Sequence, residues 1–234
     1  MPLAKPLAAP FPINISPLID TEGSQIHVVD HGAPSSVKVE LFTMKGFKGS
    51  RPFTVGDELV IDGGMASFEV VDKIGNDLKC KCTDSGLFLP CAKFSFWRDG
   101  KLVKRNYKLP TLSRKANINF GIAEGIDFIA MSFVNDVDAV RNLKDYISTK
   151  LSKSIRVLAK IESLESLQKL GEIVEASDGI MIARGDLGVE IPLEQIPVVQ
   201  EEITYACMQM NKLVIVALQL LESMVESPNP TRAE

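Results

Sequence analysis

The segment Gly-Ile-Met-Ile-Ala-Arg-Gly-Asp-Leu-Gly, residues 179–188 of a chain of 234, carries the strongest local signal for the fold. Its first five residues do not alternate with polar ones, which is typical of a parallel strand covered on both faces. The second half turns polar at Arg184 and places glycines on either side of Asp186. Such glycines let the backbone approach a ligand closely. The segment therefore predicts a buried strand that leads into a functional loop.

Three other apolar runs have the same character, and helical patterns separate them. The runs are Asp127–Phe133, Ile155–Ile161 and Leu213–Leu218. Between them, apolar residues recur at helical spacing at Val137, Val140, Leu143 and Ile147, at Leu167, Leu170 and Val174, and at Ile203, Ala206, Cys207 and Met210. This order predicts successive βα units. Such units form a barrel or an open doubly wound sheet, and the periodicity does not distinguish the two.

Residues 28–108 have a different pattern, in which short alternating strands are separated by turn formers such as Asp99-Gly100. They predict a compact all-β module. Another strand candidate, Ile13–Ile19, precedes this module, so we expect the module to be inserted into the βα series. The expected organisation is an N-terminal segment with one strand of the series at residues 1–27, the β domain at 28–108, and further βα units at 109–234.

The composition is that of an ordinary soluble globular protein, with 45% hydrophobic and 24% charged residues. A net charge of −4 gives no reason to expect a nucleic-acid or anionic-membrane partner. No apolar run is long enough to span a bilayer. The first ten residues have the features of neither a signal peptide nor a transit peptide. We therefore expect no targeting segment in this chain, which is either cytosolic or has lost such a segment.

Three cysteines lie close together in the β module, at positions 80, 82 and 91. Zinc is one interpretation, but the spacing of Cys80 and Cys82 is not that of a CxxC pair, and no histidine follows them. Reduced cysteines packed in strands are the better interpretation. The two histidines, His27 and His31, lie in or beside the module, so histidine-centred catalysis is not expected.

Charged residues follow the ends of two predicted strands. Lys160 and Glu162 are separated by one residue at the end of a strand, so their side chains point to the same side. Asp186 follows the next strand, and two carboxylates with waters and substrate oxygens are a usual way to hold magnesium. A structural salt bridge and an ordinary strand-to-helix turn are the alternatives. Asp20-Thr21-Glu22-Gly23 would reach the same edge, although by itself it indicates only a turn.

Several of these segments, in this order and spacing, resemble pyruvate kinase over roughly residues 13–234. They are Lys160-Ile161-Glu162, Ala176 through Gly188, Leu221-Glu222-Ser223-Met224 and Pro230-Thr231-Arg232-Ala233-Glu234. Ser24-Gln25-Ile26-His27 and Gln219-Leu220-Leu221 are most similar to the plastid α-type isozymes of plants.

The resemblance implies a partial (β/α)8 TIM-type barrel with the inserted β domain as a lid. It also implies a glycolytic kinase that transfers phosphate from phosphoenolpyruvate to ADP, forming ATP, in the plastid stroma or the cytoplasm. By motif position, Lys160 is catalytic and binds substrate, the backbone of Gly185 and Asp186 contacts substrate, Glu162 and Asp186 hold Mg²⁺, and Asp20 and Thr21 hold K⁺. Homo- or hetero-oligomers with other pyruvate kinase chains are expected.

The sequence also departs from that family. The chain is expected to be a fragment without the first two barrel strands, the last barrel strand and the C-terminal domain. Leu218 occupies a substrate-site position where the family has threonine or, in the α-type plastid forms, serine. Leucine cannot donate or relay a proton. We therefore expect weak or no activity from the isolated chain. The alternative is a non-catalytic regulatory or binding subunit.

Overall fold

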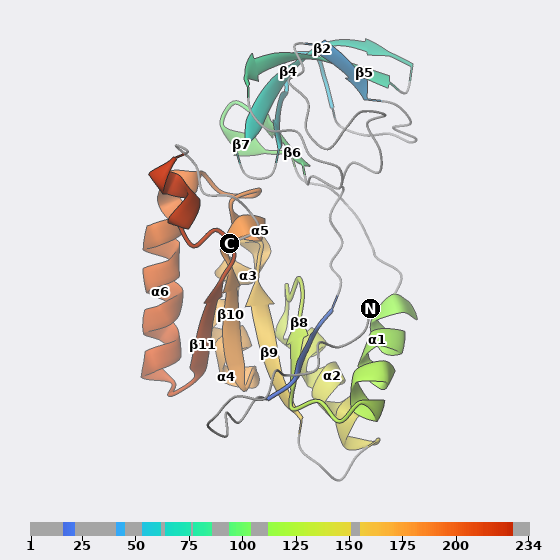
Figure 1. Cartoon of the computed structure of the whole chain (residues 1–234), viewed down its shortest axis with the longest axis vertical. Helices are drawn as coiled ribbons and strands as arrows, with labels where there is room; N and C mark the ends of the chain where they lie inside the picture. The colour runs from blue at the N-terminus through green and yellow to red at the C-terminus, as the bar shows by residue number, and fades with distance from the viewer. Residues whose placement is uncertain are drawn as a thin grey trace.

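The chain folds into two sheets of different kinds in a computed structural model, which describes residues 16–21, 41–44, 53–61, 64–75, 77–85, 94–103, 112–150 and 155–226. A parallel sheet flanked by helices forms one part, and an antiparallel sheet forms the other (Figure 1). This confirms the predicted α/β fold with a separate β domain. The domain boundaries fall partly outside the described residues and stay a prediction.

Five strands form the parallel sheet, in the order β1-β8-β9-β10-β11. Their bounds are β1 (Leu18–Asp20), β8 (Phe128–Met131), β9 (Arg156–Ile161), β10 (Gly179–Ala183) and β11 (Leu213–Ala217). Spatial order follows chain order, and every neighbouring pair is parallel. All five carboxyl ends therefore lie at one edge of the sheet.

Continuous burial explains why the strand sequences do not alternate. In β9, every residue from Val157 to Ile161 is buried, and in β10 Ile180 and Ile182 are fully buried. Each buried valine, leucine or isoleucine side chain among them contributes about 1.5–3 kcal/mol through removal from water. The helices supply the opposing apolar surface.

The helices connect the strands and bury much of the predicted apolar faces, but Leu167 and Val174 fall in two separate helices, and Met210 follows the last helix and is 41% exposed. The helices are α1 (Leu112–Ala123), α2 (Val137–Ser148), α3 (Leu164–Gln168), α4 (Leu170–Ala176), α5 (Arg184–Leu187) and α6 (Ile196–Gln209), with 3₁₀ turns η1 (Leu193–Gln195) and η2 (Glu222–Val225). Asp136 caps α2 by accepting a hydrogen bond from the Ala139 amide at 2.8 Å. None of the described helices has the length and apolar character needed to cross a membrane.

The antiparallel sheet has the order β2-β5-β4-β3-β6-β7. Its strands are β2 (Leu41–Met44), β3 (Glu58–Ile61), β4 (Ala66–Ile74), β5 (Asp77–Asp84), β6 (Phe94–Arg98) and β7 (Lys101–Leu102). Asp99 and Gly100 both have positive φ, as a two-residue hairpin between β6 and β7 requires. A second hydrophobic core forms here around Leu59, Phe68 and Phe96.

Two cysteines of this sheet, Cys80 and Cys82, lie in β5 as reduced thiols. Cys80 is buried, and burial raises the pKa of its thiol to about 11. Cys91 lies outside the described residues. The described thiols therefore agree with reduced cysteines packed in strands.

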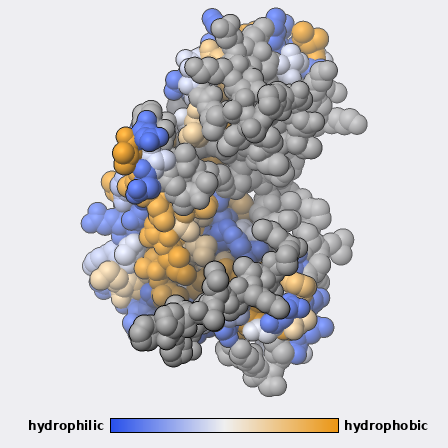
Figure 2. Space-filling view, in the orientation of Figure 1, coloured by the Kyte–Doolittle hydropathy of each residue, from blue (hydrophilic) through white to orange (hydrophobic). Residues whose placement is uncertain are grey.

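One side of the parallel sheet remains partly exposed. Figure 2 shows apolar residues gathered over β11 and the neighbouring strand. Leu213, the first residue of β11, is 47% exposed, and the remaining residues of this strand are only partly buried. Within the described sheet, β11 is an edge strand. Its surface therefore differs from β9 and β10, in which all residues but Arg156 and Met181 are buried.

Candidate functional site

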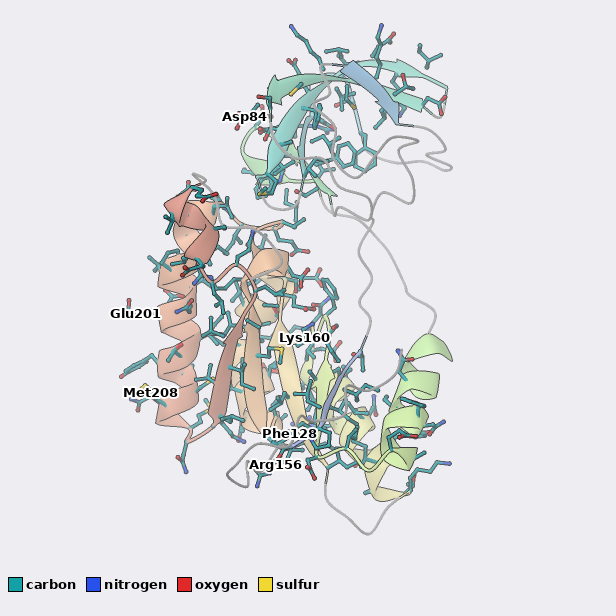
Figure 3. All side chains as sticks on the ribbon, in the orientation of Figure 1. Asp84, Phe128, Arg156, Lys160, Glu201 and Met208 are labelled. Atoms are coloured by element: carbon teal, nitrogen blue, oxygen red, sulfur yellow. The ribbon has the colours of Figure 1, made fainter. Side chains whose placement is uncertain are left out.

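Polar side chains from different strands converge at the carboxyl edge of the parallel sheet. Lys160 lies near the end of β9, Glu162 directly follows that strand, and Asp20 ends β1. Asp186 lies in α5, immediately after β10. Figure 3 shows Lys160 projecting from β9 toward β8 and β1. The parallel register creates this meeting point, since it brings the ends of all the strands to one edge.

Lys160 is the centre of the arrangement. Its Nζ atom lies 2.9 Å from Glu162 Oε1 and 2.9 Å from Asp20 Oδ2. The side chain is only 8% exposed. Burial alone would lower the pKa of Lys160, but the neighbouring Glu162 and Asp20 carboxylates outweigh it and raise the pKa. The site therefore holds a permanent ammonium ion, on the same side as Glu162, as the strand spacing predicts.

Glu162 is a buried carboxylate under opposing influences. Burial and the negative charge of Asp186 raise the pKa of Glu162 to about 7, against the effects of Lys160 and the Phe133 amide. That amide donates to Glu162 Oε2 at 2.7 Å. Phe133 has φ of 51°, an uncommon conformation for a non-glycine residue. The β8 loop thus directs a backbone donor at the carboxylate.

Asp20 and Thr21 are joined to the site through Ser132, which the sequence reasoning missed. The Ser132 hydroxyl lies 3.1 Å from Lys160 Nζ. The backbone amide of Ser132 donates to Thr21 Oγ1 at 3.0 Å. The same hydroxyl hydrogen-bonds to the Thr21 carbonyl oxygen. Ser132 directly follows β8, so a polar residue at the end of an apolar run is the signal that could have identified it.

The loops after β9 and β10 are joined by side chains that sequence reasoning also missed. Ser163 Oγ contacts Asn135 Oδ1 of the β8 loop at 2.7 Å, while the Leu164 amide donates to Glu190 Oε2 at 2.9 Å. Glu190 lies in the loop that follows α5, the short helix that carries Asp186. Polar residues within loops carry no periodic signal, which is why only the structure identifies these partners.

Leu218 and Gly185 also lie at the carboxyl edge. Leu218 directly follows β11 and has φ of 68°, which costs a non-glycine residue on the order of 1 kcal/mol. Gly185 is buried in α5, next to Asp186. The structure thus places every predicted site residue at this edge. The direct polar contacts described above join Lys160, Glu162 and Asp20, and they do not include Leu218.

The donor set fits magnesium. Glu162 and Asp186 are 1% and 2% exposed, and their charges interact strongly enough to raise the pKa of Glu162. When Asp20, Glu162 and Asp186 are all ionised, their charges outnumber the one ammonium of Lys160, and a cation would relieve the excess. No cluster of three or more acidic, histidine or cysteine ligands occurs among the described residues. A magnesium ion here would keep waters or substrate oxygens, as it commonly does.

A family model and the sequences of known proteins both match this chain, and they agree with each other. Residues 19–234 match the family described as pyruvate kinase, barrel domain. The chain is 53% identical over 240 residues to pyruvate kinase isozyme A, chloroplastic, of Ricinus communis, across 93% of this chain and 41% of that protein. The corresponding isozyme of Nicotiana tabacum is also 53% identical, with 93% and 40% covered. The pyruvate kinase of Mycoplasma genitalium is 39% identical over 184 residues, with 77% and 35% covered. The chain thus spans about two fifths of the length of the plant relatives.

Proposed function

The chain belongs to the pyruvate kinase family, and we propose that it supplies the metal-binding and phosphate-binding side of an enzyme that transfers a phosphoryl group from phosphoenolpyruvate to ADP. The observation that carries this proposal is the buried ammonium of Lys160 between the carboxylates of Asp20 and Glu162. Phosphoryl transfer depends mainly on positioning and on positive charge, and this arrangement provides a fixed cation whose side chain is only 8% exposed.

The residues divide into distinct roles in this proposal. Glu162 and Asp186 hold Mg²⁺, which when bound supplies positive charge to the phosphate oxygens. Asp20 and Thr21 contribute oxygens to a K⁺ site. Lys160 neutralises charge on the moving phosphoryl group and on the enolate. The backbone of Gly185 and Asp186 contacts substrate. Ser132 and the Phe133 amide keep Lys160 and Glu162 in place.

The names of the relatives support a proposal about where the reaction takes place. The two plant relatives at 53% identity are chloroplastic isozymes, so we place this protein in the plastid stroma. Glycolysis is the process that the family activity serves. Assembly with other pyruvate kinase chains remains part of the proposal, since the chain spans only part of those relatives.

A non-catalytic regulatory or binding subunit is the second candidate, and Leu218 favours it. This residue directly follows β11 at the edge where Lys160 and Asp186 lie, and it cannot donate or relay a proton. The two candidates differ in one measurable respect, namely whether the segment supports formation of pyruvate.

A chimera tests the proposal. Residues 16–226 replace the matching segment of the Ricinus isozyme, and pyruvate and ATP formation are measured with and without Lys160→Met. Loss of this fixed charge should lower kcat by about 100-fold or more, the scale of a lost electrostatic contact to the transition state. The control is Lys144→Met, which removes a lysine paired with Asp178 at the opposite end of β10. An inactive parent chimera, or equal activity of both lysine variants, would refute the proposed catalysis.

A further inference from the structure

Hydrogen bonds connect neighbouring loops at the carboxyl edge, and one of them links the segments that carry the two carboxylates of the candidate magnesium site. On one side, the Phe133 amide fixes Glu162 from the β8 loop at 2.7 Å. On the other side, Glu190 Oε2 accepts the Leu164 amide at 2.9 Å. Leu164 is two residues after Glu162, and Glu190 is four residues after Asp186. This hydrogen bond therefore ties together the two loops that carry the acidic pair.

Hydrogen bonds hold the backbone around Glu190, so the point from which its side chain projects is fixed. The Glu190 amide donates to the Leu187 carbonyl at 2.8 Å, and the Ile191 amide donates to the same oxygen at 2.9 Å. Leu187 is fully buried and Ile191 is 4% exposed. The turn after α5 is thus anchored in the core on both sides of Glu190. A carboxylate on such a turn can hold a neighbouring loop at a fixed distance.

The Leu164 amide needs such a partner. It belongs to the first turn of α3, where backbone amides have no partner within the helix. The hydroxyl of Ser163, the residue before it, accepts a hydrogen bond from the Ser166 amide at 3.1 Å. The Leu164 amide donates to Glu190 instead. A helix of five residues does not hold itself in place, so its position depends on contacts at its ends.

We propose that Glu190 is a positioning residue for the magnesium site: it fixes the distance between the loops of Glu162 and Asp186 without serving as a ligand. This inference rests on the proposed function, because it assumes that these two carboxylates hold the ion. Residues that orient metal ligands through hydrogen bonds affect affinity without touching the metal. Loss of the bond lets the β9 and β10 loops move independently, so the two carboxylates spend less time at the spacing that a small cation needs.

The test measures Mg²⁺ binding by titration calorimetry on the whole chain. Glu190→Ala should weaken binding by about tenfold, within the range seen for partners of metal ligands. Glu190→Gln keeps an oxygen acceptor for the Leu164 amide and should stay within about threefold of the parent. Glu194→Ala is the matched control, because it removes an exposed carboxylate from the same segment and should leave the affinity unchanged.

A second measurement does not involve the metal. Hydrogen exchange of the Leu164 amide in metal-free protein should accelerate in Glu190→Ala, and not in Glu190→Gln or Glu194→Ala. Unchanged exchange or unchanged Mg²⁺ affinity in Glu190→Ala overturns the positioning role.

Glu162→Gln separates this outcome from failure of the proposed function. Suppose that the parent chain binds Mg²⁺, that Glu162→Gln weakens this binding and that Glu190→Ala leaves it unchanged. In that case only the positioning role of Glu190 is wrong. If the parent and Glu162→Gln show no difference in Mg²⁺ binding, the proposed site is wrong and the positioning role falls with it.

Discussion

At the scale of single residues, the chemistry of the site depends on which charges burial places together. Glu162 has Lys160 and the Phe133 amide as stabilising neighbours and the Asp186 charge as an opposing one. The net effect raises the pKa of Glu162 to about 7. A carboxylate that titrates near neutrality binds a cation only when it has lost its proton. Metal binding to this chain should therefore depend on pH in the physiological range.

The pH dependence of magnesium binding follows from the direction of this shift. Because the pKa of Glu162 is higher in the folded chain than in the unfolded chain, ionisation of this group opposes folding at pH values above the unfolded-state pKa. A bound cation relieves this cost only at pH values where Glu162 is ionised. The increase in melting temperature caused by Mg²⁺ should be small at about pH 6 and larger at about pH 8. Thermal unfolding with and without Mg²⁺ measures this. In Glu162→Gln the increase should not vary with pH, and the same rise in that variant would contradict the assignment.

Leu218 allows a second prediction at this scale. In the active chimera, Leu218→Thr restores a hydroxyl at the end of β11 and should raise kcat for pyruvate formation by about tenfold, somewhat below the usual range for positioned proton transfer. Mg²⁺ affinity should change little, because Leu218 is not one of the proposed ligands. Leu220→Thr, at an exposed position nearby, is the control. Equal rates for the parent and Leu218→Thr would mean that the missing hydroxyl does not limit turnover.

At the scale of elements, the parallel strands pack closely enough that a single methyl group matters. A Cβ atom at Gly179 would lie 2.8 Å from the Leu213 carbonyl oxygen and 2.9 Å from Leu158 Cδ2. The first contact involves the backbone of the neighbouring strand, which cannot turn aside as a side chain can. The glycine at the start of β10 thus sets the approach of β10 to β11.

Gly179→Ala should consequently destabilise the parallel sheet. Overpacking of this kind costs about 1–3 kcal/mol in the free energy of unfolding. Gly171→Ala is the matched control: it lies in α4, where an added Cβ would meet nothing within 4 Å, and should stabilise the chain by about 0.5–1 kcal/mol. Urea unfolding followed by far-UV circular dichroism measures both. A Gly179→Ala variant as stable as the parent would show that the strands can separate at no cost.

At the scale of the whole molecule, the described residues form two hydrophobic clusters. One lies in the parallel sheet and its helices, and the other lies in the antiparallel sheet. The single tryptophan, Trp97, belongs to β6 of the antiparallel sheet, whereas every described helix belongs to the other part. Tryptophan fluorescence and helical circular dichroism therefore report on different parts of the chain.

Asp57 offers a way to unfold one part selectively. It is 1% exposed and accepts hydrogen bonds from Arg98 at 2.7 and 2.9 Å and from the Thr54 amide at 2.9 Å. Burial alone would raise the pKa of Asp57, but these hydrogen bonds lower it overall. Because the pKa of Asp57 is lower in the folded chain, ionised Asp57 stabilises the fold at pH values above its unfolded-state pKa of about 4. This stabilisation is lost as the pH falls through the folded-state pKa.

Asp57→Asn should destabilise the antiparallel sheet by about 1–3 kcal/mol at neutral pH and reduce its further loss of stability in acid. The midpoint followed by Trp97 fluorescence should fall while that followed by far-UV circular dichroism stays in place. Asp72→Asn removes an exposed carboxylate of the same sheet and is the control. Equal shifts of both midpoints would show that the two parts unfold as one unit.

Much of this molecule could be predicted from the sequence because the relevant signals are local. The apolar run at Gly179–Ala183 matches β10 residue for residue, and the Asp99-Gly100 pair forms the expected hairpin turn. The meeting of Lys160 with Glu162 also follows from side chains that alternate along an extended chain. Strand ends were less accurate, since the run Asp127–Phe133 yields a strand only at Phe128–Met131.

The sequence by itself thus determined the fold class, the family and the identity of the charged residues that follow the strands. Only the tertiary structure decided which of them meet. Lys160 contacts Asp20, 140 positions away, because the registers of β1 with β8 and of β8 with β9 place Asp20 level with Leu158, within reach of the long Lys160 side chain. Ser132 and Glu190 acquire their partners in the same way. The physical reason is that chain periodicity fixes where a side chain points, whereas packing of distant strands and loops fixes what it reaches.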